Sequence, residues 1–197
     1  MGRKYELKQR AKSQQETRRR IVEAAIELHG TIGPARTTVS AIAERAGVQR
    51  HTYYRHFPDE RSLGLACSGL HMERNPLPDP AGWREIADPE RRLRRALEEL
   101  YAYYERNESM LANVIRDAEL DPVMGEVTEL RIGAPMAAIR AALAGALPRR
   151  RTSLAALDLA LDFNSWRLLA RRSGLDGRGA AGLMAAMIVC AGGRPRD

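Results

Sequence analysis

The densest set of groups able to hydrogen-bond to nucleic acid lies in a short polar stretch of the sequence. Its cations, hydroxyls, imidazoles and amide belong to Gln49, Arg50, His51, Thr52, Tyr54, Arg55 and His56. Arg50 suits a bidentate contact with O6 and N7 of guanine, and Gln49 suits adenine. Thr52, Tyr54 and His56 carry donors that suit phosphate oxygens. The chemistry that these residue types predict is recognition of double-stranded DNA.

Two short helices joined by a glycine turn must position these side chains. Thr37 and Thr38 stand at the start of the first helix, where they can join backbone N–H groups in holding a phosphate. Gly47 ends that helix, because glycine adopts a left-handed turn at little cost. Tyr53 and Phe57 are four residues apart and can both turn inward. Residues 38–57 therefore fit a helix-turn-helix motif whose second helix enters the major groove.

The charge of the chain is concentrated near this motif. The formal net charge is +7. Residues 1–75 hold fourteen Lys and Arg against eight Asp and Glu, and residues 76–197 hold eighteen against seventeen. An excess of +6 at one end indicates an anionic partner for that end. Charge alone equally fits a basic face that only keeps the protein soluble.

The remaining pattern predicts an all-α protein, because no stretch alternates apolar and polar residues as strands do. We expect a flexible arm over 1–14 and a first helix from Thr17. A proline-containing loop over 75–88 separates two regions of different composition. These are a small basic domain over 15–75, which contains the helix-turn-helix motif, and a larger, nearly neutral helical domain over 84–193.

The larger domain is expected to consist of amphipathic helices. One starts at Asp88-Pro89 and breaks around 107–109. Another, over 123–147, should kink or split near Gly133 and Pro135. A helix over 153–172 shows two apolar stripes, and a small-residue helix covers 179–191. The carboxylates of 88–129 fall between arginines and are predicted to lie on solvated helix faces.

The run over residues 37–63 resembles the DNA-binding domain of TetR-type transcriptional regulators. The resemblance covers roughly 15–75 and is carried by Arg19-Arg20-Ile21-Val22-Glu23-Ala24-Ala25, Ala46-Gly47-Val48 and Tyr54-Arg55-His56-Phe57. It implies an all-helical homodimer with an N-terminal three-helix DNA-binding domain and a C-terminal domain that binds an inducer and dimerises. It also implies that Thr52, Tyr54 and His56 touch the phosphate backbone and that Arg50 and His51 contact bases.

Two positions depart from the family pattern. The family commonly has Lys, which meets phosphate, where this chain has Glu60. A carboxylate there repels DNA unless Arg61 substitutes for the lysine. The family favours Ser or Thr where this chain has Gln49, and Gln is a poor helix cap.

The larger domain is predicted to bind a ligand and to dimerise. The candidates for the lining of a ligand cavity are Tyr101, Tyr104, Asn107, Met110, Leu111, Val114, Met136, Phe163 and Trp166. They indicate a largely apolar or aromatic inducer, although each fits a plain core residue as well. Helices 153–172 and 179–191 are expected to pair with a second subunit, or else to bury both stripes within one subunit.

These features predict a cytoplasmic transcriptional regulator, specifically a ligand-responsive repressor that binds a palindromic operator as a dimer. The alternative is a helical ligand-binding or scaffold protein that has lost specific DNA recognition. We expect no enzyme activity, cofactor, metal site or membrane span. All four histidines precede residue 72 and none are three or four residues apart. Cys67 is expected to be a small core residue rather than a redox sensor.

Overall fold

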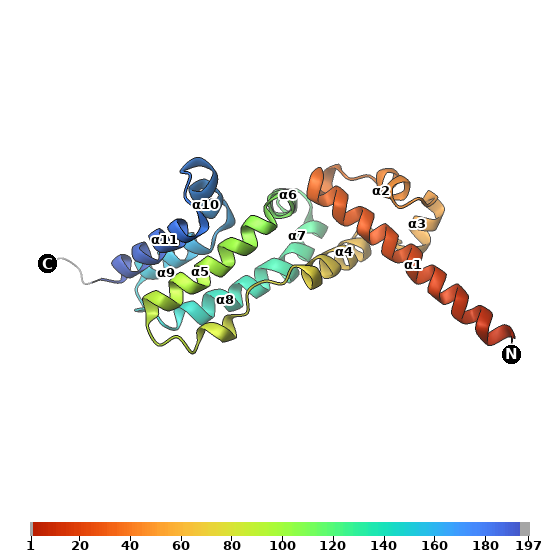
Figure 1. Cartoon of the computed structure of the whole chain (residues 1–197). Coiled ribbons are helices and arrows are strands. Elements are labelled where there is room, and N and C mark those ends of the chain that lie inside the picture. Colours follow the sequence, from red (N-terminus) through yellow and green to blue (C-terminus); the bar gives the residue numbers. More distant parts are fainter. Residues whose placement is uncertain (1, 194–197) are drawn as a thin grey trace. The chain divides into compact units, whose positions relative to one another are not determined.

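The computed structural model describes residues 2–193, with the side chains of residue 5 and residues 8–193 (Figure 1). Every regular element in that range is helical. The elements are α1 (Gly2–Thr31), η1 (Pro34–Arg36), α2 (Val39–Arg45), α3 (Arg50–His56), α4 (Glu60–Arg74), η2 (Pro80–Trp83), α5 (Pro89–Arg106), α6 (Glu108–Ala118), α7 (Pro122–Thr128), η3 (Glu129–Gly133), α8 (Ala134–Ala144), α9 (Arg151–Leu161), α10 (Phe163–Arg167), η4 (Leu168–Arg172) and α11 (Gly177–Gly192). No helix within residues 2–193 has both the length and the apolar character needed to cross a bilayer.

The chain divides into two compact units. The N-terminal unit comprises Met1–Arg74 together with Ser109–Arg131, and the C-terminal unit comprises Asn75–Glu108 together with Ile132–Asp197. The first 74 residues therefore share a unit with most of α6, with α7 and with the start of η3.

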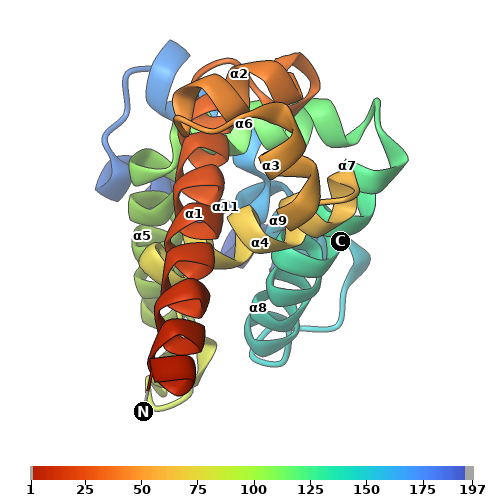
Figure 2. The ribbon, with the colours of Figure 1, turned by 90° about the vertical axis from the view of Figure 1, so that its right-hand side faces the viewer.

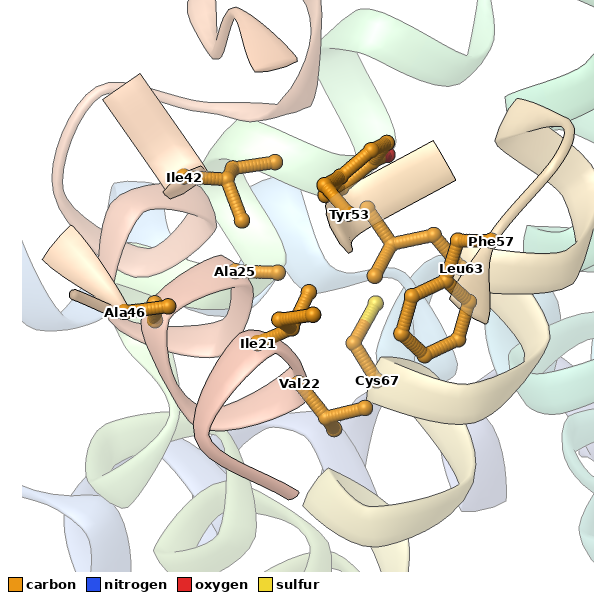
Figure 3. Close-up of a cluster of buried hydrophobic side chains, with 10 residues drawn as sticks. Ile21, Val22, Ala25, Ile42, Ala46, Tyr53, Phe57, Leu63 and Cys67 are labelled. Atoms are coloured by element: carbon orange, nitrogen blue, oxygen red, sulfur yellow. The ribbon is translucent and has the colours of Figure 1, made fainter. Parts of the chain in front are cut away.

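In the N-terminal unit, α1 packs against α2 and α4, and α4 packs against α7. Figure 2 shows α1 in front with α2, α3 and α4 beside it. The core side chains come from all four helices (Figure 3). They are Ile21, Val22, Ala24, Ala25, Ile42, Ala46, Tyr53, Phe57, Leu63 and Cys67. As predicted, Tyr53 and Phe57 turn inward and Cys67 is a buried core residue.

The flexible arm predicted for residues 1–14 is wrong for 2–14, because α1 begins at Gly2. This stretch has no apolar period, and its described side chains, residue 5 and residues 8–14, are exposed as that indicates. However, Glu, Lys, Gln, Arg and Ala are strong helix formers and can extend a helix that is packed further along. Residues 8–16 are accordingly both helical and exposed.

Caps and turns fix the ends of the short helices. The hydroxyl of Thr38 accepts the N–H of Ala41 at 3.1 Å, which caps α2. Gly47 has φ +64° in the turn between α2 and α3. Asp59 accepts the N–H of Ser62 at 2.6 Å and so caps α4. The Thr38 cap and the Gly47 turn were predicted from the sequence.

In the C-terminal unit, α5, α9 and α11 pack against one another (Figure 1). Leu97 and Leu100 of α5, Leu157 of α9 and Ile188 of α11 are fully buried. Asp88 accepts the N–H of Arg91 and caps α5, with Pro89 in its first turn. The helix ends at Arg106, which confirms the predicted break around 107–109.

The predicted helix over 153–172 is instead divided into three segments. The chain extends at Asp162, whose carboxylate caps α10 by accepting the N–H groups of Asn164 and Ser165. Tyr101 and Tyr104 donate their hydroxyls to the carbonyls of Ala160 and Leu161 at 2.9 and 2.5 Å. The break is stable because those carbonyls find partners from α5, which apolar periodicity cannot reveal.

The predicted split near Gly133 and Pro135 is confirmed. A π-helical turn, η3, separates α7 from α8, and Pro135 lies in the first turn of α8. Pro135 has no N–H to donate, and the π-helical turn directly before it changes the hydrogen-bond pattern of the helix at this point.

Candidate nucleic-acid interface

The second helix of the helix-turn-helix motif has one buried face and one exposed face. Tyr53 is 3% exposed and Phe57 is fully buried, with their ring centroids 6.1 Å apart. This pair anchors α3 to the core of the N-terminal unit. The opposite side carries Arg50, His51, Tyr54 and Arg55, all exposed.

Burial divides the nine predicted DNA-binding residues into two groups. The exposed ones are Thr38, Gln49, Arg50, His51, Tyr54 and Arg55, and the partly buried ones are Thr37, Thr52 and His56. Gln49 takes the extended N-cap conformation but makes no side-chain cap bond, so its amide is free for another partner. The Thr37 hydroxyl donates to the carbonyl of Gly33 at 2.7 Å. Thr37 is therefore the predicted contact least available to phosphate.

His51, Thr52 and His56 differ in their surroundings. The Oγ1 of Thr52 lies 3.2 Å from Nε2 of His51. Nε2 of His56 is buried and has no hydrogen-bond partner within the described chain. Burial, aided by the positive charges of Arg55 and Arg18, lowers the pKa of His56. His56 is therefore held neutral next to the exposed face of α3.

The cations near the motif differ in their availability. Arg45 pairs with Glu27, and Arg74 pairs with Glu23. Arg50 and Arg55 take part in no salt bridge within the described residues, and both are exposed. The two arginines on α3 are thus free to meet an anionic partner.

The end of the motif is arranged around Arg61. Its Nε lies 3.1 Å from both carboxylate oxygens of Glu126, and its Nη2 lies 2.6 Å from Oε1. The Glu126 carboxylate raises the pKa of Arg61, and the Arg61 guanidinium lowers the pKa of Glu126. Glu60 is exposed in the first turn of α4. Arg61, the expected substitute for the family lysine, is therefore held by a carboxylate of α7.

Two arginines of α1 that lie near the motif were not among the predicted DNA-binding residues. The guanidinium carbon of Arg18 lies 4.7 Å above the centre of the Phe57 ring, beside α3. Nη1 of Arg20 lies 3.7 Å from where a Cβ on Gly47 would stand, so Arg20 reaches the turn of the motif. The run Arg18-Arg19-Arg20 was visible in the sequence. The sequence alone could not show which of these three arginines face α3, because that depends on the rotation of α1 about its axis and on its packing.

Asp117 of α6 was also missed and corrects an expectation. The carboxylates of 88–129 were predicted to be solvated, but Asp117 is 1% exposed. It accepts the backbone N–H of Ala35 at 2.9 Å and the Nε of Arg116 at 2.7 Å. A loop 82 residues away in sequence supplies the partner, so the local pattern carried no signal for its burial.

The predicted ligand-lining residues are distributed over both units. The C-terminal unit buries four of them, Tyr101, Tyr104, Phe163 and Trp166. The ring centroid of Tyr104 lies 5.5 Å from that of Phe163 and 5.7 Å from that of Trp166. In the same unit, Asn107 is buried and Met136 half-buried. The others, in the N-terminal unit, are Met110, Leu111 and Val114, of which Leu111 is buried. The structure brings the four aromatic residues together as packed core.

The fold and the exposed face of α3 define a helix-turn-helix protein. Residues 21–67 match the family model of bacterial regulatory proteins of the tetR family. The HTH-type transcriptional regulator TtgR of Pseudomonas putida is 36% identical to this chain over 88 residues. That match covers 44% of this chain and 42% of TtgR, less than half of either protein.

Solved structures share the fold over most of the chain. The TetR family transcriptional regulator PfmR of Thermus thermophilus has a TM-score of 0.60 at 22% identity, over 88% of this chain and 99% of its own. A transcriptional regulator of Rhodococcus sp. Rha1 has a TM-score of 0.61 at 18% identity, over 88% and 95%. The similarity to the tetR family is thus carried by residues 21–67, and the relatives and solved structures that this chain resembles are named as transcriptional regulators.

Proposed function

We propose that this protein is a cytoplasmic transcriptional regulator that binds double-stranded DNA through α3. The observation that carries this proposal is the exposed face of α3. Arg50 and Arg55 form no ion pair with any described residue, and Tyr53 and Phe57 anchor the helix from behind. Arg50 and His51 meet base edges, with Gln49 beside them. Thr38, Thr52, Tyr54, Arg55 and His56 contact phosphates, and Thr37 supports the start of α2.

The proposed regulator acts as a homodimer through its C-terminal unit. Large apolar side chains remain 41–49% exposed on α9, η4 and α11. They are Leu159, Leu168, Leu183, Met187 and Val189. A second copy that covers them places two α3 helices on one DNA duplex. The operator is then a palindrome with half-sites roughly 34–36 Å apart, or a multiple of that distance.

We also propose that the protein is a repressor released by a largely apolar or aromatic inducer. The aromatic cluster of Tyr101, Tyr104, Phe163 and Trp166 supports this choice of ligand class. These side chains are packed together, so a ligand enters only if the cluster opens. Binding to the open form then shifts the population of conformations and weakens the DNA complex.

A gel-shift assay on the DNA upstream of the protein's own gene tests the proposal. We expect sequence-specific binding that is lost in Arg50→Ala and kept in Arg84→Ala, which removes an exposed arginine of the C-terminal unit. If about six phosphates are neutralised, log K falls with log salt with a slope of about −5. Absence of binding at low salt, or a slope near zero, would refute DNA recognition and support a helical ligand-binding or scaffold protein.

A further inference from the structure

A pocket of about 220 Å³ lies within the N-terminal unit, apart from the aromatic cluster of the C-terminal unit. His29 of α1 and Met124 of α7 line it together with residues of η1, α2, α3 and α4. Tyr53, Tyr54 and Phe57 of α3 form an aromatic wall, and Asp59 and Glu60 lie at the start of α4. Tyr53, Phe57 and Leu63, three of its lining residues, are drawn together in Figure 3.

The lining has a distinctive charge. Its fourteen residues include two carboxylates and no Lys or Arg. This is notable in a region, residues 1–75, whose formal charge is +6. Glu60 is exposed and takes part in no ion pair within the described chain, and Asp59 uses one carboxylate oxygen to cap α4. The pocket is thus a negatively charged hollow in a basic domain.

Two further polar groups in the lining are neutral. Burial lowers the pKa of His29 to about 4, so this imidazole carries no charge at pH 7. Burial, together with the negative charges of Glu60 and Asp59, raises the pKa of Tyr53 to about 12. The Tyr53 hydroxyl makes no hydrogen bond within residues 2–193, so it is available to a ligand. Neither group offsets the two carboxylates.

We propose that this pocket binds a small organic cation with an apolar or aromatic body. Carboxylates attract the cationic group, and the faces of aromatic rings add to that attraction. The apolar walls, such as Phe57, Leu63 and Met124, accept the body of the ligand. The volume is below the roughly 300 Å³ at which sites for drug-sized molecules begin, so a single-ring amine is the size that fits.

The position of the pocket ties its occupancy to α3. Tyr54 belongs both to the lining and to the proposed phosphate contacts, so a ligand that holds its ring lowers the affinity for DNA. Linkage then requires DNA to lower the affinity for the ligand by the same factor. This coupling, unlike the site itself, rests on the proposed function.

The site is tested without DNA, by following backbone amide signals in NMR while phenethylamine is added to the full chain. We expect saturable shifts at pocket residues such as Thr37, Gly64 and Met124. The anionic 3-phenylpropionate has the same body and should leave these signals unchanged. Equal binding of both compounds, shifts confined to other regions, or no saturable shift up to millimolar phenethylamine would overturn the proposal.

Variants separate charge from shape. Glu60→Gln keeps the size of an exposed side chain and should weaken phenethylamine binding about fivefold, the upper range for an exposed charge pair. Glu44→Gln removes an exposed carboxylate of α2 that does not line the pocket, and its affinity should equal that of the unmodified protein. The same loss in both variants would indicate a general charge effect and refute the site.

The coupling has its own measurement. Saturating phenethylamine should weaken operator binding severalfold in the unmodified protein, and Glu60→Gln should need about fivefold more phenethylamine for the same effect. Unchanged operator affinity would refute the coupling, whereas the NMR titration decides the site whether or not the protein binds DNA.

Discussion

Asp117 shows how a single buried charge fixes a loop. Its carboxylate accepts from Ala35 in the loop between α1 and α2 and from Arg116 in its own helix. Burial alone raises the pKa of Asp117, but the bonds from Arg116 and Ala35 outweigh it, so the pKa lies below its usual value. The ionised form is therefore the one that stabilises the fold.

The loop passes close to Asp117 at Gly33. A side chain added at position 33 should therefore lower the free energy of unfolding. Gly33 has φ +91°, and a Cβ at this position would stand 2.6 Å from Oδ2 of Asp117. We expect Gly33→Ala to lower the free energy of unfolding by about 2 kcal/mol or more, from backbone strain plus the clash. Gly174→Ala is the matched control: Gly174 has φ +70° but no atom within 4 Å of the added Cβ, so it isolates the strain. Equal losses in urea denaturation would exclude the clash.

His29 predicts a pH dependence of stability. Its pKa is about 4 in the folded protein because of burial, and roughly 6.5 when unfolded. Between these values the unfolded chain binds the extra proton, so stability is fully present above pH about 6.5 and falls as the pH drops toward 4. The shift corresponds to roughly 3 kcal/mol.

Thermal unfolding between pH 7 and pH 4 measures this effect. We expect the decline in Tm to be clearly smaller in His29→Leu than in the unmodified protein. His51→Leu removes an exposed imidazole and keeps the buried one, so its decline should match that of the unmodified protein. If both variants retained the full decline, another group would be responsible.

At the scale of elements, the contact between α4 and α7 restrains a cation beside the proposed DNA-binding helix. Glu126 of α7 holds Arg61 near the start of α4, where the family pattern places a phosphate-binding lysine. The pair is exposed on both sides, so its own contribution to stability is small. Its larger effect is on the charge that α4 offers to DNA.

Releasing this arginine should strengthen DNA binding. In Glu126→Gln, we expect higher operator affinity and a salt slope more negative by about 1, as one more phosphate is neutralised. Asp158→Asn, which releases Arg140 in the C-terminal unit, is the control and should leave the slope unchanged. Fluorescence anisotropy at several salt concentrations measures both variants. An unchanged slope in Glu126→Gln would mean that Arg61 does not reach the backbone.

The same scale explains what could be predicted from the sequence. The faces of α3 followed from the spacing of Tyr53 and Phe57, because inward residues in a short helix are fixed by its period. The break at Asp162 depends on Tyr104, and the burial of Asp117 depends on Ala35. Both partners come from distant elements, so no local sequence pattern could predict either feature. The pocket of the N-terminal unit was missed for the same reason, since its wall combines residues from six elements.

At the scale of the whole molecule, the proposed function requires two copies, and the C-terminal unit offers a surface for that contact. A soluble monomer rarely exposes a contiguous group of large apolar side chains, and such groups mark interaction surfaces. Leu183 and Met187 are four residues apart on α11 and both about two-fifths exposed. Close approach of another helix is favoured by the exposed Ala186 beside Met187 and by Gly182 beside Leu183.

Charge on this surface should therefore separate the subunits. We expect the double variant Leu183→Glu and Met187→Glu to sediment as a monomer at micromolar concentration, because two buried carboxylates from each copy would face one another. Leu120→Glu is the matched control: Leu120 is 77% exposed but lies in the N-terminal unit, and this variant should remain dimeric.

The monomeric variant should also bind the intact operator no more tightly than a single half-site, because its two α3 helices are no longer linked. A double variant that stays dimeric would place the interface elsewhere, whereas a monomer with full operator affinity would show that one α3 helix suffices for recognition.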